Sequence, residues 1–227
     1  MAQSGTALAL SLQRAACSRK GFSVQIRVAA FLLFLGGMMF DYFAKEKSDF
    51  LKKKDKSKKG SVDKDAAGLV NEINSKNDYY TTSSCSGRIV LLEMEHRKKN
   101  ECSWIFAKHD EVNFKEIFES LNSHKNKNEV WFNQQPLILH VACRNLDSAR
   151  IFLGIARKIF RRAGIIALSS KKVVLEIIGD ERLETIVADE KFVADEKYLK
   201  ELVKYANRNF ADNKKKIGRF LKILIKL

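Results

Sequence analysis

The sequence contains few of the features that mark secreted, metal-binding or dinucleotide-binding proteins. Its single proline and 11 glycines argue against a long disordered or collagen-like tract. The four cysteines form no Cys-x-x-Cys pair and no Asn-x-Ser/Thr sequon is present, so we expect free thiols in a reduced, cytoplasmic setting. No Gly-x-Gly-x-x-Gly run lies between a strand and a helix, which excludes the Rossmann fingerprint as the means of holding a cofactor.

Positive charge is what the sequence has in excess. The 42 lysines and arginines against 27 aspartates and glutamates give a formal net charge of +15. A surplus of this size attracts polyanions over long distances, and nucleic acid is the usual partner. The densest run, which includes Lys52, Lys53 and Lys54, is either a solvated surface or a strip that binds nucleic-acid phosphates. Composition alone favours the solvated surface.

Residues 1–37 differ in composition from the rest of the chain. They contain no acidic residue and lead into the apolar stretch Val28–Phe40, whose 13 residues are fewer than the ~20 that span a bilayer. The stretch resembles the apolar core of a signal peptide, but no clear small-x-small cleavage site follows it. We favour a start at Met38 or Met39, so that 1–37 is a spurious or disordered extension and 38–227 is the domain. A targeting segment and a membrane tether are the alternatives.

Apolar periodicity predicts helices and short strands along the remaining chain. Helices are expected near residues 41–55, 64–76, 113–122, 146–162 and 195–226, with Gly164 as a C-cap and with Asn213 interrupting the apolar side of the last helix. Strands are expected at residues 79–81, 89–95, 102–109, 137–143, 165–168, 173–178 and 183–187. Strands in local hairpins between helices indicate an α+β fold: a single domain with a mostly antiparallel sheet covered by helices, and not a Rossmann fold.

Three polar clusters occur where packing alone would not require polar residues. The first, at residues 55–63, combines Ser57, Lys59, Gly60 and Asp63. Its cations, flexible backbone and carboxylates suit a phosphate or a charged cofactor. An ordinary helix–loop–helix in which Asp63 caps the second helix explains the same residues.

The second cluster, Thr81–Arg88, has six consecutive small polar residues before its glycine and arginine. A simple hairpin needs two or three turn residues, so we predict an extended loop whose hydroxyl and backbone N–H groups form an anion-binding nest. An ordinary connecting loop is the alternative. Because no histidine is nearby in the sequence, we interpret Cys85 as a spectator thiol and not as a nucleophile.

The third cluster contains His109 at the end of one predicted strand, and His140, Cys143 and Arg144 on another. Residues four apart in a strand share a face, so we expect His140 and Arg144 to project to the same side. If the two strands are neighbours, either histidine is suited to act as a general base near neutral pH. A histidine satisfied within the core is the alternative.

The order and spacing of these clusters resemble those of a known family. Residues 55–63 (Asp-Lys-Ser-Lys-Lys-Gly-Ser-Val-Asp), 79–88 (Tyr-Tyr-Thr-Thr-Ser-Ser-Cys-Ser-Gly-Arg), 104–109 (Trp-Ile-Phe-Ala-Lys-His) and 139–144 (Leu-His-Val-Ala-Cys-Arg) are similar to motifs of the tRNA wybutosine-synthesising protein 3 family, in its short archaeal-type form. Each motif alone is moderately specific, and four in the same order are strongly so. The similarity extends from about Met39 to the C-terminal helix.

The resemblance implies an S-adenosyl-L-methionine-dependent methyltransferase with a non-Rossmann fold. Its substrate would be the anticodon loop of tRNA-Phe, in which it methylates nitrogen-4 of the tricyclic wyosine-type base at position 37. We expect no metal and no membrane association. A non-catalytic basic RNA-binding module is the alternative function.

Candidate site residues follow from the clusters and the resemblance together. The proton on the target nitrogen would pass to His109 or His140, with Asp63 as the other candidate. Cofactor binding is expected of Ser57, Lys59, Gly60, Ser83, Ser84, Cys85, Ser86, Gly87 and Arg88. RNA binding is expected of Lys52, Lys53, Lys54, Trp104 and Arg144, and of the basic side of the last helix. Stacking of Trp104 on a base would contribute about 1–3 kcal/mol.

Overall fold

The computed structural model describes residues 41–52, 63–94, 102–125, 128–191 and 193–227. The chain divides into two compact units, Met1–Tyr42 and Phe43–Leu227, and the fold below is that of the second. The predictions for residues 1–37, and those for Lys53, Lys54, Ser57, Lys59 and Gly60, lie outside the described residues. Within the described ranges, no helix has the length and apolar character needed to cross a membrane.

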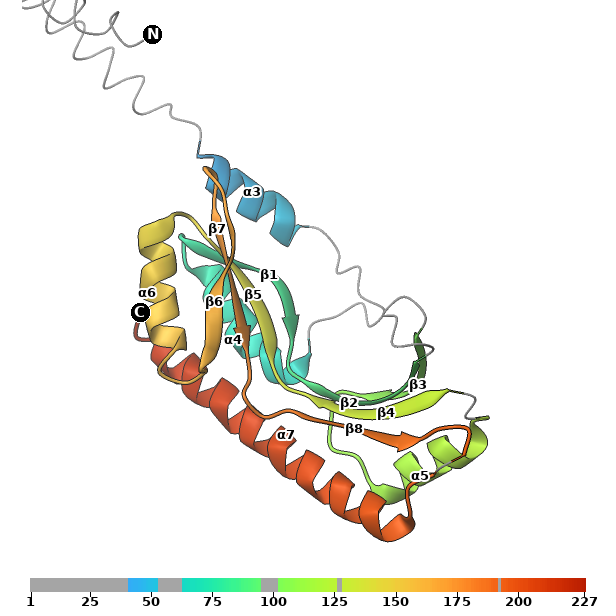
Figure 1. Cartoon of the computed structure of the whole chain (residues 1–227). Helices are drawn as coiled ribbons and strands as arrows, with labels where there is room; N and C mark the ends of the chain where they lie inside the picture. The colour runs from blue at the N-terminus through green and yellow to red at the C-terminus, as the bar shows by residue number, and fades with distance from the viewer. Residues whose placement is uncertain (1–40, 53–62, 95–101, 126–127, 192) are drawn as a thin grey trace, which may run out of the picture. The chain divides into compact units, whose positions relative to one another are not determined.

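Groups of two or three consecutive strands are separated by helices along the described part of the chain (Figure 1). The helices are α3 (Tyr42–Leu51), α4 (Lys64–Ser75), α5 (Phe114–Ser123), α6 (Leu146–Ala156) and α7 (Glu196–Leu224). The strands are β1 (Tyr79–Cys85), β2 (Arg88–Met94), β3 (Cys102–Lys108), β4 (Glu129–Gln135), β5 (Ile138–Cys143), β6 (Arg162–Leu168), β7 (Val173–Ile178) and β8 (Leu183–Ala188).

The strands form two four-stranded sheets in which every pairing is antiparallel. The first sheet has the order β1-β5-β7-β6 and the second has the order β3-β2-β4-β8. The chain therefore passes directly from one sheet to the other between β1 and β2, between β4 and β5, and between β7 and β8. The predicted α+β class and the antiparallel pairing are confirmed, with the strands divided between two sheets.

Side-chain caps set the starts of α5 and α6. Asn113 accepts a hydrogen bond from the Glu116 backbone N–H at 2.9 Å before α5, and Asn145 does the same for Ser148 at 2.9 Å before α6. Both caps are reciprocal, because the third helical residue bonds back to the cap N–H. Such caps satisfy N–H groups that have no partner inside a helix, and each stabilises it by about 1 kcal/mol.

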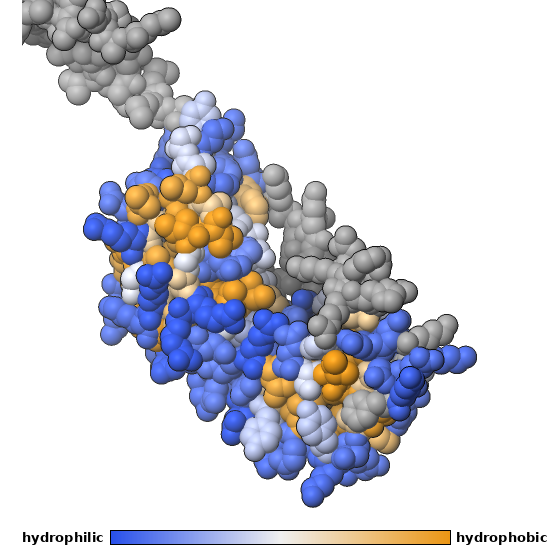
Figure 2. All heavy atoms as spheres, viewed as in Figure 1, coloured by the Kyte–Doolittle hydropathy of each residue, from blue (hydrophilic) through white to orange (hydrophobic). Residues whose placement is uncertain are grey.

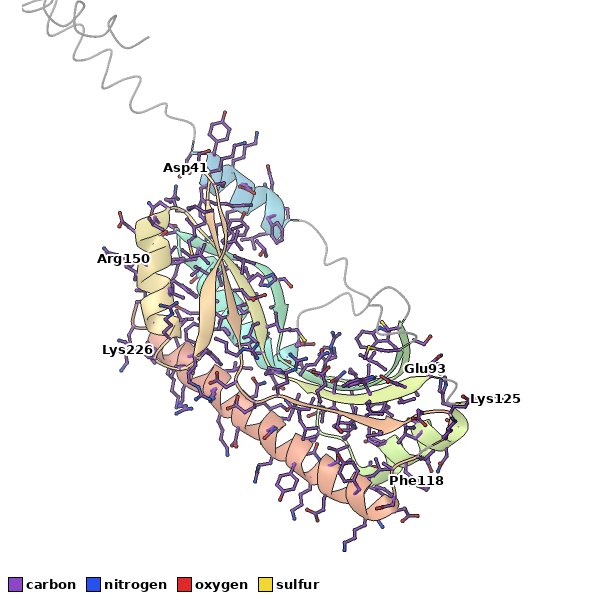
Figure 3. The ribbon with its side chains drawn as sticks, viewed as in Figure 1. Asp41, Glu93, Phe118, Lys125, Arg150 and Lys226 are labelled. Carbon is purple, nitrogen blue, oxygen red and sulfur yellow. The ribbon has the colours of Figure 1, made fainter. Side chains whose placement is uncertain are left out.

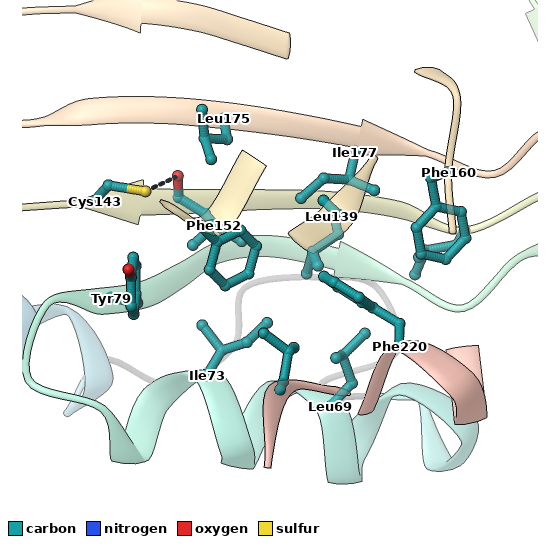
Figure 4. Close-up of a cluster of buried hydrophobic side chains, with 14 of the residues drawn as sticks. Leu69, Ile73, Tyr79, Leu139, Cys143, Phe152, Phe160, Leu175, Ile177 and Phe220 are labelled. Atoms are coloured by element: carbon teal, nitrogen blue, oxygen red, sulfur yellow. Dashed lines mark hydrogen bonds between the residues drawn. The ribbon is translucent and has the colours of Figure 1, made fainter. Parts of the chain in front are cut away.

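Each sheet buries one face against helices. The core of the first sheet includes α4, α6 and the C-terminal half of α7, and Figure 4 shows Phe220 of α7 there with Phe152 and Phe160. The Phe220 ring centroid lies 5.8 Å from that of Phe152 and 5.5 Å from that of Phe160. The core of the second sheet includes α5 and the N-terminal half of α7, with Leu199 and Ala206 fully buried. The apolar side of α7 thus serves both cores, as its periodicity predicts.

Helix α3 packs on the opposite face of the first sheet. Its Phe43 lies 5.3 Å from the Tyr80 ring, centroid to centroid, and Ala142 of β5 completes this small apolar group. Glu46 of α3 forms an ion pair with Lys172, which precedes β7. The hydrogen bond from Lys172 lowers the pKa of Glu46, against the opposing effect of its partial burial. Aromatic contact and charge together therefore fix α3 to this sheet.

The predicted loop at residues 82–88 is wrong. Thr82–Cys85 continue β1, Arg88 begins β2, and only Ser86 and Gly87 separate the two strands. Small hydroxyl residues look like a loop in isolation, but here their backbone pairs with β5, and Ser83 lies opposite His140. The turn joins strands of different sheets, so it is not a hairpin.

Three other predictions also differ from the structure. The helix near 146–162 ends at Ala156, and Gly164 is not its C-cap but lies within β6, opposite Glu176 of β7. The first residue of this helix, Leu146, is 57% exposed, although the apolar periodicity of the segment predicts that it is buried. Strand β4 (Glu129–Gln135) was not expected, since its sequence mixes charged, amide and aromatic residues without a regular alternation.

Apolar side chains also reach the surface of the first sheet, and Figure 2 shows such a group over the region of α6 and β6. The exposed residues of β6 include Ile165, Ile166 and Leu168, which is 68% exposed. Strand β6 is one edge of the first sheet, and β1, which carries the polar second cluster, is the other. The two edges therefore differ in chemistry.

Asn213 joins the segments that cross between the sheets. This α7 side chain is fully buried; its Nδ2 donates to the Ser86 carbonyl at 2.6 Å and its Oδ1 accepts from the Leu137 N–H at 2.9 Å. The third crossing, from β7 to β8, begins at Gly179. Asn213 Oδ1 packs so closely against this glycine that an added Cβ atom would lie only 2.9 Å from it. The interruption in the apolar side of α7 is thus an internal hydrogen-bonded link.

Gly87 should be the least replaceable glycine of this junction. It has a φ of +114°, and an added Cβ would lie 2.7 Å from the Gln135 carbonyl oxygen. We expect Gly87→Ala to lower the free energy of unfolding by about 1–3 kcal/mol. Gly154→Ala is the matched control, because Gly154 lies in α6 with no atom within 4 Å of the added Cβ, and it should raise stability by about 0.5–1 kcal/mol. Urea denaturation measures both, and equal effects would contradict the role assigned to Gly87.

Candidate active site

A polar row crosses the face of the first sheet that is turned away from α4, α6 and α7. Ser83, His140 and Glu176 are directly opposite one another on β1, β5 and β7, so their side chains project to the same face. Their neighbours Leu139 and Val141 point the other way, into the core. His140 Nε2 lies 2.9 Å from Glu176 Oε1, and Ser83 is exposed. The row therefore presents a hydroxyl, an imidazole and a carboxylate on one face.

A second polar group surrounds Asp63, which is 6% exposed. Asp63 occupies the predicted N-cap position of α4, but its side chain makes no cap hydrogen bond. Its Oδ2 accepts instead from the Ser86 N–H at 3.0 Å and from the Ser86 hydroxyl at 3.1 Å. His109, directly after β3, places Nδ1 3.0 Å from the same oxygen. Three segments far apart in the sequence thus converge on one carboxylate.

The contact with Asp63 determines how His109 presents its ring. A neutral imidazole that donates its Nδ1–H to a carboxylate keeps the lone pair on Nε2. The His109 side chain is 27% exposed, so the ring is half-buried against its partner. The arrangement suits His109 to act as a proton acceptor at Nε2, with Asp63 orienting the ring.

Cys85 lies at the same point, with its Sγ 3.8 Å from His109 Nδ1. His109 is not near Cys85 in the sequence, but the two residues meet in space, because β1 and the end of β3 come together although 24 residues separate them. The interpretation of Cys85 as a spectator thiol stays a prediction. Donor atoms of Asp63, Cys85 and His109 lie within 4.8 Å of one another, a spacing that a divalent ion could bridge. Hydrogen bonds account for the same geometry, and the absence of a metal stays a prediction.

Arg88 and Trp104 lie together on the second sheet. The Arg88 guanidinium carbon is 4.6 Å from the Trp104 ring centroid, and Arg88 Nε donates to Gln135 Oε1 at 2.6 Å. Trp104 is 44% exposed, as a base-stacking residue requires. Arg88 thus belongs to a strand with its side chain stacked on an indole, and not to an anion-binding loop.

Arg144 and Cys143 have structural partners. Arg144 Nε donates to Asp78 Oδ1 at 2.6 Å, and its guanidinium lies 4.9 Å from the Phe43 ring centroid. Since Phe43 also packs on Ala142, Arg144 lies on the same side of the sheet as His140, as expected. Burial raises the pKa of Cys143 to about 12, and Figure 4 shows this thiol within the first core. Cys143 is therefore a core residue.

The basic side of α7 faces away from the polar faces of the sheets, because the apolar side of the helix packs on their cores. Several of its cations are paired with acids on the same helix, such as Lys200 with Glu196 and Lys215 with Asp212. Other cations of this side, Arg150 of α6 and Lys226 near the C-terminus, also project outward (Figure 3). Lys214 of the same helix pairs instead with Asp65 of α4 and with Asp110, the residue after His109.

The structure also gives the positions of three other predicted site residues. Lys52, directly after α3, is exposed, Ser84 lies in β1, and Gly87 forms the turn to β2. Glu176 was missed in the sequence, although a lone carboxylate in the apolar run of β7 was a signal for it. Asn133 and Gln135 were missed together with strand β4, since no strand was expected there.

The chain is similar to a known protein family and to several known proteins. The family model "Methyltransferase TYW3" matches residues 45–226. A tRNA(Phe) 7-((3-amino-3-carboxypropyl)-4-demethylwyosine(37)-N(4))-methyltransferase of Archaeoglobus fulgidus is 37% identical over 191 residues, 82% of this chain and 94% of the relative. The tRNA wybutosine-synthesizing protein 3 homolog of Danio rerio is 35% identical over 190 residues, 81% of this chain and 75% of the relative.

A solved structure has the same fold. The PH1069 protein from Pyrococcus horikoshii OT3 matches with a TM-score of 0.70 and 30% identity, over 81% of this chain and 93% of that one. The family match covers every helix and strand from α4 to α7, and with it Asp63, His109 and His140. The chain therefore belongs to the TYW3 family of methyltransferases.

Proposed function

We propose that this protein transfers a methyl group from S-adenosyl-L-methionine to nitrogen-4 of the tricyclic wyosine-type base at position 37 of tRNA-Phe. The observation that carries the proposal is the convergence of Asp63, Ser86 and His109, each from a different family-like motif, on one hydrogen-bonded group. The archaeal relatives named as methyltransferases of this base are similar over most of their length. The net charge of +15 suits a tRNA substrate.

The polar row on the first sheet fits a nucleoside-containing methyl donor. Ser83, His140 and Glu176 offer donors and acceptors of the kind that ribose hydroxyls and an amino group require. When bound, S-adenosyl-L-methionine would supply an electrophilic methyl group on a positively charged sulfur. The chain's own task is then to align the two reacting partners, since positioning is the larger part of such catalysis.

Proton removal is the chemical task we assign to His109. The target nitrogen must lose a proton as it gains the methyl group, and His109 Nε2 is the ring atom left to accept it. Asp63 holds Nδ1, and Ser86 fixes Asp63 through its N–H and its hydroxyl. Cofactor binding through Ser86 stays a prediction, but both of its hydrogen-bond donors already serve Asp63.

The RNA would approach from the side of His109 and Trp104. The anticodon loop is single-stranded, so its target base can leave the stack at a cost of a few kcal/mol. Trp104 is exposed for stacking, whereas Arg144 is engaged by Asp78 and contributes charge only near α3. We keep the cytoplasm as the predicted location, because the sequence has no sequon and no Cys-x-x-Cys pair.

Methyl transfer is tested with radiolabelled S-adenosyl-L-methionine. The substrate is tRNA-Phe that carries the unmethylated tricyclic base, and the control is tRNA-Phe with guanosine at position 37. We expect label on the tricyclic substrate and none on the control. A protein that binds both RNAs and labels neither would be a non-catalytic RNA-binding module, and the proposal would fail.

Substitution separates the two histidines. We expect His109→Ala to lower kcat by about 10²–10⁴-fold, the usual contribution of a general base, without weakening S-adenosyl-L-methionine binding measured by calorimetry. His140→Ala removes the partner of Glu176 from the polar row and should weaken cofactor binding with a smaller change in kcat. A His109→Ala protein with an undiminished rate would exclude this residue as the base.

A further inference from the structure

Both tryptophans of the chain lie on one face of the second sheet. Leu92 of β2 is directly opposite Trp104 of β3 on one side and Trp131 of β4 on the other. Directly opposite residues share a face, so the three side chains form a row. This is the face turned away from α5 and α7, because Leu91, the neighbour of Leu92, belongs to the core that those helices cover.

The Arg88–Trp104 stack lies on the same face. Arg88, Val90 and Leu92 alternate along β2, and Gln135, which accepts from Arg88, is opposite Arg88 on β4. Arg88 follows Ser86 and Gly87 directly, and Lys108, the residue before His109, is opposite Ile89. The stack therefore borders the group formed by Asp63, Ser86 and His109.

Asn133 adds an unpaired polar atom to this face. It lies opposite Val90, between Trp131 and Gln135 along β4, and is 6% exposed. Its Oδ1 is buried and has no hydrogen-bond partner within the part of the chain that the structure describes. A buried carbonyl without a partner destabilises a fold, and a leucine of similar shape would avoid that cost. A bound ring that carries an N–H group would donate a hydrogen bond to this unpaired acceptor, which lies beside an aromatic surface.

We propose that Arg88, Trp104 and Asn133 form a seat for a planar, purine-derived ring, with Asn133 Oδ1 accepting a hydrogen bond from an N–H or amino group of that ring. The ring stacks beside the Arg88–Trp104 pair, where a sequence-tolerant aromatic contact provides affinity, and Asn133 provides discrimination. Two ligands of the proposed function contain such a ring: the adenine of S-adenosyl-L-methionine and the tricyclic base of the tRNA. The inference rests on the proposed function and assigns Asn133 as its specificity residue.

Tryptophan fluorescence tests the seat, because both tryptophans of the chain lie on this face. We would titrate the full-length protein with S-adenosyl-L-methionine alone, with tRNA-Phe carrying the tricyclic base, and with tRNA-Phe carrying guanosine at position 37. Asn133→Leu keeps the side-chain shape and removes the acceptor, and it should weaken binding of one ligand about tenfold or more. Asn133→Asp keeps an acceptor and should restore most of that binding.

Asn209→Leu is the matched control. The same chemical change is made on α7, on the other side of the sheet, where the Asn209 amide donates to Gln134 Oε1. It should leave the titrations unchanged. Urea denaturation supplies a second readout: Asn133→Leu should be at least as stable as the wild type, whereas a purely structural role for Asn133 would make it less stable.

The ligand that loses affinity identifies the source of the ring. Weaker binding of S-adenosyl-L-methionine assigns the seat to adenine, and weaker binding of the tricyclic tRNA alone assigns it to the target base. Unchanged binding of all three ligands by Asn133→Leu overturns the proposal. A wild type that transfers no methyl group while Asn133→Leu still loses RNA affinity would refute the proposed function and keep the seat.

Discussion

The buried carboxamide of Asn213 is the interaction on which the rest of this structure depends. The chain changes sheets three times through connections that include backbone groups outside the paired strands. Asn213 satisfies two of them, the Ser86 carbonyl and the Leu137 N–H, from a helix that serves both cores. Unpaired, these groups would each cost about 1–3 kcal/mol. The relative placement of the two sheets is thus tied to one side chain.

The same link orders the proposed active site. With its carbonyl held by Asn213, Ser86 directs its N–H and hydroxyl at Asp63, and Asp63 in turn holds His109. All of the polar groups of Ser86 are therefore committed, and its role is to transmit the position of α7 to the imidazole. The site lies where the two sheets meet, between the polar row of the first sheet and the Arg88–Trp104 stack of the second.

Much of the fold could be predicted from the sequence where the pattern was local. The apolar periodicity of α4 and α7 and the alternation of β7 needed no knowledge of neighbours, and the α+β class followed from them. The strand Thr82–Cys85 could not be predicted, because only its pairing with β5 distinguishes it from a loop. Strand β4 was not predicted for a similar reason: Asn133, Gln134 and Gln135 follow each other without alternation, and only the pairing with β2 and β8 identifies a strand.

The sequence motifs identified several residues of the candidate site but did not show how these residues are arranged in space. Motif residues pointed to Asp63, Cys85, His109 and His140, yet His140 lies in the first sheet and His109 follows a strand of the second, and Cys85 meets His109 across 24 residues. Such contacts depend on which strands pair, and that is decided by the whole core. Glu176, Asn133 and Asn213 carry no motif, and only burial and hydrogen bonding reveal what they do.

The central claim is that Asp63 holds the Nδ1–H of His109 so that Nε2 is the basic nitrogen. Nitrogen-15 NMR of the histidine rings, at a pH where His109 is neutral, tests this directly. The account predicts that His109 is protonated at Nδ1 with an unprotonated Nε2, and that Asp63→Asn weakens this preference. A His109 ring protonated at Nε2 in the unaltered protein would contradict the account, because the nitrogen assigned to accept the substrate proton would already carry one.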